Sequence, residues 1–526
     1  MHSASCLPKG GSRFAPFLGV RFHNKKRKLT GFELVWYLGV FAFLLVWFTQ
    51  IHPLVVYDAD DWTYLAYVRS ATPIWGDWNP AKVFPETVMP FFSTVAVYTL
   101  MPLLGDYILA QTVMHALVVS ISITGYVFCF AELVKRVLPV KTAGAVSASA
   151  LFLLLHFLIF RSRQQDNSYL FYCFDLNCYY NYLIPGLINA SLVMYMLNNP
   201  RFDAFLAGGS PAQKGIFYLI LYYAIFSNLT TSGILAAFAG SCLLISIIRK
   251  GKSFRLGQFV RENALYLVIL LAWLVSAIFE LSGGRATSSE WNGSFAWKLK
   301  YTLYGLKEVA LGCNPVFWCI SVGCVIAAIA ALMAFRGKKP GNKVDPWLSG
   351  VCIVAAAAIL VYTLFLCAAV SPSYIYRSEY LFEFCFFGLM IVSLCFAYLL
   401  SAWPKLFMLT PLALCILVSQ INTRGTTFQE STVENLDPKI CAEISRDIID
   451  QYVQADQAGQ KEMLLYVPVH TEDPDTQDNW PHSVVLIPRI TNTLYEHGII
   501  SYPIDITVVP SVEMNEKYHL EIPQGE

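Results

Sequence analysis

The stretch FELVWYLGVFAFLLVWFTQ, residues 32–50, indicates the class of fold, because Glu33 is its one charged side chain in 19 positions. A helix that crosses the hydrocarbon core of a bilayer needs roughly 20 mostly apolar residues. This stretch therefore predicts a membrane-spanning helix. Soon after it the chain reads YDADDW, residues 57–62, which places three carboxylates near the mouth of the span.

The composition extends this prediction to the whole chain. Of the 526 residues 56% are hydrophobic and 14% are charged, whereas soluble proteins carry about 25% charged residues. The net charge of +1 gives no reason to expect nucleic-acid binding. The basic run KKRK (25–28) precedes the first apolar stretch, and no small-residue cleavage site follows that stretch. We therefore expect a multi-pass protein of the cell membrane whose residues 1–32 form a cytoplasmic basic segment rather than a cleaved signal.

Apolar runs of span length recur between residues 33 and 421, and the loops between them give the orientation. If the proline-broken segment 85–106 does not cross, basic loops such as ELVKRVLPVK (132–141) all fall on the cytoplasmic side, as the positive-inside rule requires. We therefore expect 85–106 to be a re-entrant or interface-lying helix pair within a long outer loop, 51–106. This predicts about eleven crossings, within a range of about 10 to 13, with the N-terminus inside and the C-terminus outside. The predicted spans lie near residues 33–50, 107–131, 142–160, 180–198, 214–227, 230–248, 263–282, 314–335, 347–369, 380–401 and 405–421.

The tail, residues 422–526, has a different pattern. DPKICAEISRDIIDQYVQADQAG has apolar residues at helical spacing, and its Asp437-Pro438 pair is a helix start signal. Two β-type runs, 461–469 and 504–511, flank a second helical stretch that ends at Gly498. The sequence predicts a small extracytoplasmic α/β domain with an accessory role.

The carboxylates of the outer loop admit two interpretations. Asp58, Asp60 and Asp61 could form a solvated turn or cap a short helix. However, the loop that holds them is long and rich in tryptophan, and long loops in compact proteins usually carry function. Ionisable groups at membrane depth also tend to mark a site or a pathway. We therefore expect the chemistry on the outer face.

An acidic pair that closely follows the first span, with helices lying along the membrane after it, resembles the GT-C superfamily of membrane glycosyltransferases. The motif here is DADDWTYLAYV, and the resemblance covers about residues 30–421. The resemblance is greatest to the bacterial members that decorate cell-wall or lipid-linked glycans. It implies that the chain forms an uncharacterised branch of the superfamily. The chain has no WWD sequence, which argues against oligosaccharyltransferase activity. The resemblance implies a glycosyltransferase that takes a sugar from a polyprenyl-phosphate donor on the outer face.

Such a reaction requires a base for the acceptor hydroxyl, which a carboxylate can supply. Asp60 and Asp61 are the catalytic candidates, with Asp60 favoured as the base and Asp58 as a helix cap or substrate contact. The leaving lipid phosphate needs cations, and arginine binds phosphate oxygens bidentately. The acceptor would be a cell-envelope glycan or a lipid. The substrate-binding candidates are Lys82, Tyr179, Tyr180, Arg285 and Arg377.

Several alternatives remain open on these residues. The arginines could be interfacial snorkelling side chains, and the tyrosines could be ordinary belt residues. Asp60 and Asp61 could share Mg²⁺ or Mn²⁺ by oxygen ligation, although no metal is required by the predicted chemistry. Cys173 and Cys178 could be paired or free. A polytopic transporter or a lipid or glycan flippase is the alternative function.

Overall fold

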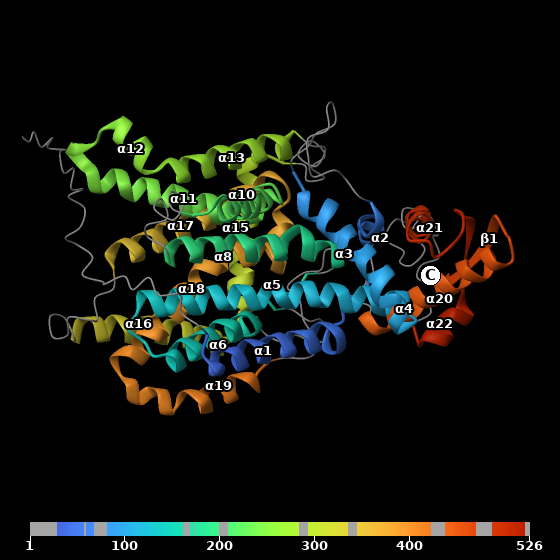
Figure 1. Cartoon of the computed structure of the whole chain (residues 1–526), viewed down its shortest axis with the longest axis horizontal. Coiled ribbons are helices and arrows are strands. Elements are labelled where there is room, and N and C mark those ends of the chain that lie inside the picture. The colour runs from blue at the N-terminus through green and yellow to red at the C-terminus, as the bar shows by residue number, and fades with distance from the viewer. Residues whose placement is uncertain are drawn as a thin grey trace, which may run out of the picture.

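The computed structural model is an elongated bundle of helices with a small domain at one end (Figure 1). Most of the long helices run roughly along the long axis of the molecule, and the C-terminal domain projects from one end. The structure describes residues 29–56, 59–67, 81–160, 169–173, 175–198, 209–282, 293–334, 345–421, 437–469 and 487–520.

The first half of the bundle begins with α1 (Gly31–Val46), which continues as a π-helical turn, η1 (Trp47–Ile51). A short α2 (Ala59–Ala66) follows at the end of the first span. The next elements are η2 (Phe84–Val88), α3 (Met89–Val95), η3 (Ala96–Leu100), α4 (Met101–Leu104), α5 (Tyr107–Val137), α6 (Thr142–Leu158), α7 (Leu176–Cys178), η4 (Tyr179–Leu183) and α8 (Ile184–Asn198).

The second half contains most of the remaining long apolar helices. Its elements are α10 (Pro211–Ile225), α11 (Leu229–Lys250), η5 (Gly251–Ser253), α12 (Leu256–Glu262), α13 (Ala264–Leu281), α15 (Phe295–Gly312), α16 (Pro315–Ala334), α17 (Pro346–Ala369), η6 (Pro372–Tyr376), α18 (Ser378–Ala402), η7 (Pro404–Met408) and α19 (Thr410–Val418).

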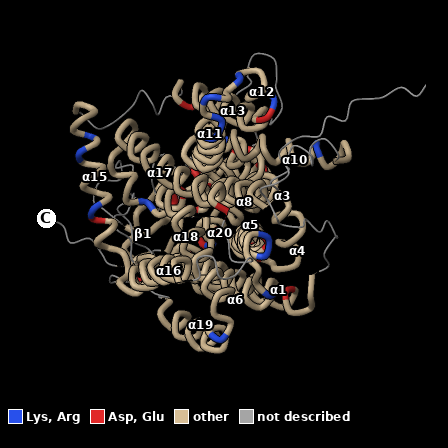
Figure 2. The backbone as a smooth tube through the Cα atoms, turned by 90° about the vertical axis from the view of Figure 1, so that its left-hand side faces the viewer, with Lys and Arg blue, Asp and Glu red and all other residues tan. Residues whose placement is uncertain are grey.

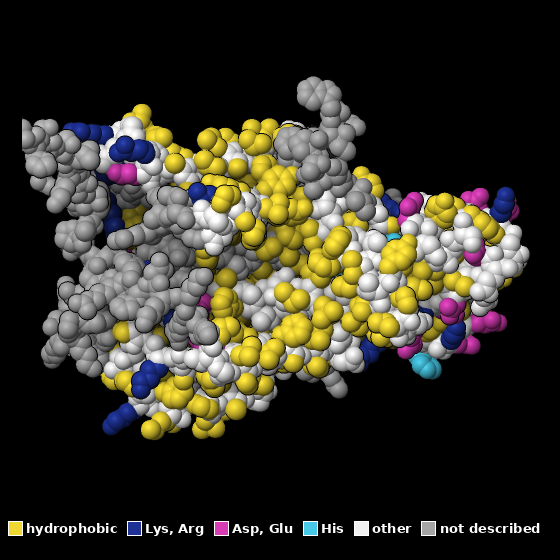
Figure 3. Space-filling view, in the orientation of Figure 1, with side chains coloured by type: hydrophobic (Ala, Val, Ile, Leu, Met, Phe, Trp, Pro, Cys, Tyr) yellow, Lys and Arg dark blue, Asp and Glu magenta, His cyan; other side chains and the backbone are white. Residues whose placement is uncertain are grey.

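Among the described helices, eight are long and apolar enough to cross a membrane. Their surface agrees with this, since hydrophobic side chains cover the middle of the bundle in Figure 3 and most of the tube in Figure 2 is uncharged. The chain is therefore a helical polytopic membrane protein. One of the eight is Phe84–Leu104, for which the sequence predicts no crossing, and four predicted spans are not among the eight. Those four are 142–160, 180–198, 214–227 and 405–421, so the count of about eleven crossings stays a prediction.

Residues 84–104 form one continuous helical run, from η2 to α4. The prediction of a helix pair in this segment is wrong. Its prolines do not break the run, because Pro85, Pro90 and Pro102 each lie at the start of one of its segments, where a missing N–H is tolerated. In Figure 1, α3 and α4 lie between the bundle and the C-terminal domain.

α5 links the two ends of the bundle. Its 31 residues correspond to a helix of about 46 Å, which exceeds the roughly 30 Å of a hydrocarbon core. Its first residue, Tyr107, contacts the C-terminal domain through His497. Its last turn carries Lys135, which contacts the first turn of α1. The C-terminal domain and the N-terminus of α1 therefore lie at opposite ends of the bundle.

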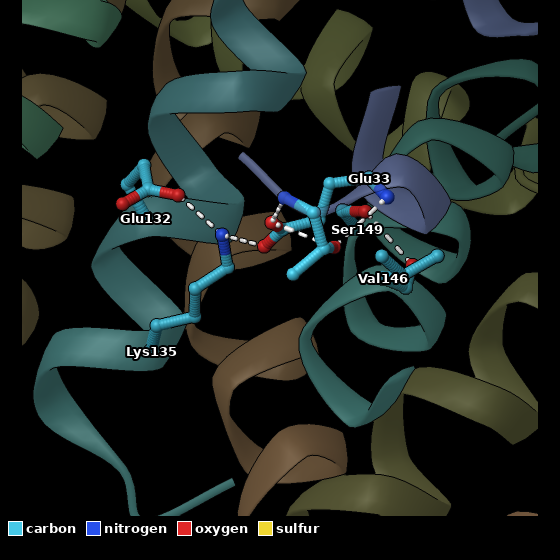
Figure 4. A network of polar contacts seen from close by, with 6 residues as sticks. Glu33, Glu132, Lys135, Val146 and Ser149 are labelled. Atoms are coloured by element: carbon cyan, nitrogen blue, oxygen red, sulfur yellow. Dashed lines mark hydrogen bonds and ion pairs between the residues drawn. The ribbon is translucent and has the colours of Figure 1, made fainter. Parts of the chain in front are cut away.

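The end of the bundle at α1 is held by a buried ion pair (Figure 4). The Lys135 ammonium lies between the carboxylates of Glu33 on α1 and Glu132 on α5. Glu33 also completes a capping box with Thr30, whose backbone N–H donates to Glu33 Oε2 at 2.8 Å. The Lys135 and Glu33 side chains are only 6% and 1% exposed. This network fixes α1 against α5 where both helices reach the same end.

The C-terminal domain is a small α/β unit. Its elements are α20 (Pro438–Gln457), β1 (Glu462–Pro468), α21 (Ile487–Glu496), β2 (Asp505–Ser511) and α22 (Val512–Tyr518). The two strands pair in parallel, with Glu462 opposite Asp505. Ile448, Tyr452, Leu465 and Leu494 are buried in its core. The predicted helix–strand–helix–strand order of the tail is confirmed.

Candidate functional site

The predicted acidic pair lies in the first turn of α2, at the end of the bundle that carries the C-terminal domain. Carboxylates in a first turn are stabilised by the helix dipole, which explains in part why the sequence DDWTYLA begins a helix here. Successive side chains on a helix point about 100° apart. Asp61 is fully buried, whereas the Asp60 side chain is 41% exposed. The two carboxylates therefore have different surroundings.

Asp61 joins α2 to the bundle. Its Oδ1 atom accepts a hydrogen bond from the backbone N–H of Asn177 in α7 at 2.6 Å. A buried hydrogen bond to a charged group contributes roughly 1.5–3 kcal/mol. This contact makes Asp61 a positioning residue for α2 in the structure, while its predicted catalytic role stays a prediction.

Asp60 faces the C-terminal domain. Arg489, at the start of α21, donates from a guanidinium nitrogen to Asp60 Oδ1 at 3.0 Å. Both side chains are partly open to solvent, 33% for Arg489 and 41% for Asp60. Arg489 was not among the residues predicted from the sequence. The two partners are 429 positions apart, and no motif links them.

Three further contacts dock the C-terminal domain on the same surface. Thr493 donates from its hydroxyl to the carbonyl of Trp62 in α2. The His497 ring bonds to the Tyr107 hydroxyl at 2.8 Å, and the Tyr107 ring stacks on Trp62. Arg446 of α20 forms an ion pair with Asp106, the N-cap of α5. The domain is thus bound to α2, which carries the acidic pair, and to the start of α5.

This docking should be sensitive to acid through His497. Burial lowers the pKa of His497 to about 4 from its ordinary value of 6.5. Between these values the unfolded chain binds a proton that the docked chain does not, so stability falls as pH falls from 6.5 and levels off below 4. We expect a loss of roughly 2 kcal/mol between pH 7 and pH 5.

The measurement is the thermal unfolding of the purified chain in micelles at several pH values. In His497→Gln the slope over this pH range should be reduced, because glutamine keeps a hydrogen-bonding group for Tyr107 but does not titrate. An unchanged slope in this variant would assign the acid sensitivity to other groups.

Arg377 contacts α7 at Cys178, the residue that follows the Asn177 contact of Asp61. Its Nε atom donates to Glu379 at 2.6 Å, and a terminal nitrogen donates to Cys178 Sγ at 3.2 Å. The guanidinium also lies over the rings of Tyr182 and Tyr374, at 5.6 and 5.5 Å from their centroids. Consecutive residues of α7, Asn177 and Cys178, thus contact the two predicted residues. Arg377 is already bound on several sides by protein groups.

Tyr179 and Tyr180 point into the bundle. Tyr179 is 1% exposed and packs edge-on against Phe48. Tyr180 is fully buried, and its hydroxyl bonds to His115 Nδ1 at 2.7 Å. In this structure neither ring has a face available to a sugar, because the π-helical turn η4 directs both into the core. In this arrangement both tyrosines contribute to the packing of the bundle, and their predicted role in substrate binding stays a prediction.

The other predicted residues are not gathered at this site. Lys82 occupies a turn with a φ of 54°, just before η2, and no described contact joins it to Asp60. Asp58 and Arg285 lie outside the described residues. Cys173 and Cys178 are free thiols, and burial raises the pKa of each.

Metal binding finds no support in the described part of the chain. No group of three or more His, Cys, Asp or Glu side chains there is placed to hold an ion. The Asp60 and Asp61 carboxylates, the predicted oxygen ligands for Mg²⁺ or Mn²⁺, bind different protein partners.

No protein-family model, curated protein or solved structure matches the chain.

Proposed function

We propose that the chain is an inverting glycosyltransferase that moves a sugar from a polyprenyl-phosphate donor to a cell-envelope glycan or lipid acceptor on the outer membrane face. The observation that carries the proposal is the pair of Asp60 and Arg489, a half-open carboxylate beside a half-open guanidinium at one end of the bundle. The pair supports the proposal because the reaction needs a base and a cation close together.

The reaction uses both charges. The acceptor oxygen attacks the anomeric carbon of the donor sugar and forms the new glycosidic bond. The bond from that carbon to the phosphate oxygen breaks, and the lipid phosphate leaves with the electron pair. Asp60 takes the proton of the acceptor hydroxyl as general base, and a cation stabilises the charge on the departing phosphate. Asp61 holds α2 against α7 and so fixes the helix turn that carries Asp60.

The proposed orientation places the C-terminal domain outside the cell and α12 inside. It rests on the separation of the two ends by α5 and on the charges, since described Lys and Arg side chains gather around α12 at the end away from the C-terminal domain (Figure 3). The positive-inside rule assigns such an end to the cytoplasm.

Single cysteines test this orientation. Arg255 and Glu462 are exposed at opposite ends of the molecule, so Arg255→Cys should be shielded from an impermeant thiol reagent in intact cells, while Glu462→Cys is labelled. The exposed native Cys319 and Cys415 are first replaced by alanine, and permeabilised cells provide the control for Arg255→Cys. Labelling of Arg255→Cys alone in intact cells would invert the topology and remove the outer-face site.

The activity itself is tested with the purified chain in micelles or lipid nanodiscs, supplied with polyprenyl-phosphate sugars and a cell-envelope glycan or lipid acceptor. Transfer of a labelled sugar to the acceptor supports the proposal. If no donor in the panel supports sugar transfer although the C-terminal domain remains docked, the result would argue against the proposal.

One observation favours transport as a second candidate. Glu383 lies within the apolar helix α18 and has no exposed surface. Both oxygens of its carboxylate are buried and make no hydrogen bond within the described part of the chain. Ionisable groups buried among spans often mark a proton or substrate pathway. Passage of a labelled lipid-linked sugar across a vesicle membrane without its transfer to an acceptor would favour this function.

A further inference from the structure

The C-terminal domain presents a guanidinium to the proposed site, although the domain itself lies outside the bundle. Arg489 is in the first turn of α21, and α21 packs directly on α2. Within the described part of the chain, its guanidinium makes one hydrogen bond, to Asp60. An arginine has five N–H donors in a planar arrangement. The other donors of Arg489 make no hydrogen bond to the described residues, and the side chain is 33% exposed.

Arg377, the arginine predicted from the sequence, offers less to a ligand. Its side chain is 16% exposed, and Glu379, Cys178 and two tyrosine rings already surround the guanidinium. A phosphate would have to displace a carboxylate of the same chain from a nearly buried position. The comparison of the two sites favours Arg489 as the residue that meets an anionic ligand.

We infer that the C-terminal domain is a working part of the site and that Arg489 binds the phosphate of the lipid-linked donor. This inference rests on the proposed glycosyltransferase function. The guanidinium matches phosphate oxygens bidentately, and its distance of 3.0 Å from Asp60 Oδ1 places the phosphate next to the proposed base. The tail therefore has more than the accessory role predicted from the sequence.

The same geometry links donor binding to the base. In the structure Asp60 Oδ1 accepts a hydrogen bond from Arg489. A phosphate that binds the guanidinium competes with this oxygen for Arg489, so donor binding weakens the contact between Arg489 and the proposed base. The contact between Asp60 and Arg489 is then the state of the site before the donor binds, and donor binding disrupts this contact.

Binding of undecaprenyl phosphate to the full chain in lipid nanodiscs tests the inference separately from turnover. Arg489→Ala should weaken binding about 10- to 100-fold, as expected for the loss of hydrogen bonds between charged groups, and Arg489→Lys should restore part of the affinity. Arg446→Ala is the matched control, because Arg446 also ties the domain to the bundle through one ion pair, with Asp106. It should change the affinity less than twofold.

Asp60→Asn gives a readout that a purely structural role of Arg489 would not change. Without the competing carboxylate, the affinity for undecaprenyl phosphate should rise several-fold even though sugar transfer is lost. Equal weakening in Arg489→Ala and Arg446→Ala would show that Arg489 only docks the domain, and this would overturn the inference.

The remaining outcomes separate the inference from the proposed function. Normal phosphate binding by Arg489→Ala, in a chain that transfers sugar and needs Asp60, would refute the inference and leave the function standing. Selective loss of phosphate binding in Arg489→Ala, in a chain that transfers no sugar, would support the anion site and refute the glycosyltransferase function.

Discussion

Replacing Asp60 by asparagine should lower the rate of sugar transfer about 10²–10⁴-fold, which is the usual contribution of a positioned general base. In terms of the activation barrier this is roughly 3–5 kcal/mol. Asparagine keeps the size of the side chain and can still bond to Arg489, but it cannot take the acceptor proton. The Asp60 side chain is 41% exposed, so the substitution should leave insertion and folding intact. The measurement is turnover of purified protein with a polyprenyl-phosphate sugar.

Asp61→Asn provides the contrast. Asp61 is fully buried and accepts the N–H of Asn177. Asparagine can still accept this N–H but carries no charge, so the replacement should mainly reduce the free energy of unfolding, by roughly 1 kcal/mol. Activity that survives at low temperature in Asp61→Asn but not in Asp60→Asn would assign the base to Asp60. Full activity in both variants would show that the acidic residues act only as a helix cap. The proposed reaction would then lose its main support.

The sequence predicts the local structure well because local structure depends on short-range patterns. Apolar length identifies seven of the eight described helices that are long enough to cross a membrane, and Asp437-Pro438 correctly marks the start of α20. The sequence does not predict that residues 84–104 form one continuous helical run, because each proline is interpreted as a break. In the structure those prolines lie at the starts of helical segments, where their missing N–H costs little.

The composition of the site is harder to predict than the helices. The sequence picks out Asp60 by its place after the first span, but the Asp60–Arg489 contact joins residues 429 positions apart and depends on how the C-terminal domain docks. Tyr179 shows that the fold also decides which way a side chain points. Aromatic residues at a membrane boundary suggest an exposed belt or a sugar platform, and only the fold reveals that η4 turns this ring into the core.

Removal of the Lys135 charge should have the largest effect on stability. Lys135→Met leaves the Glu33 carboxylate, which is 1% exposed, buried without its cation. Breaking a buried pair by removing one partner typically costs 3–5 kcal/mol, a figure we expect roughly to apply here. The expected result is a lower free energy of unfolding in micelles and a loosened contact between α1 and α5.

The double variant Glu33→Gln/Lys135→Met separates the pair from its individual charges. Glutamine keeps the capping box with Thr30 because it can accept the same N–H. The remaining partner of Lys135, Glu132, is 31% exposed and can be solvated. Replacing a whole buried pair by neutral groups is often neutral or stabilising, so most of the stability lost in Lys135→Met should return. A double variant as unstable as Lys135→Met would show that the lysine acts through its packing or through Glu132 rather than by neutralising Glu33. α5 runs from this ion pair to Tyr107 beside the proposed site. If the double variant recovers both stability and sugar transfer, the site requires that α5 is held in place. It does not then require the charges of Glu33 and Lys135 themselves.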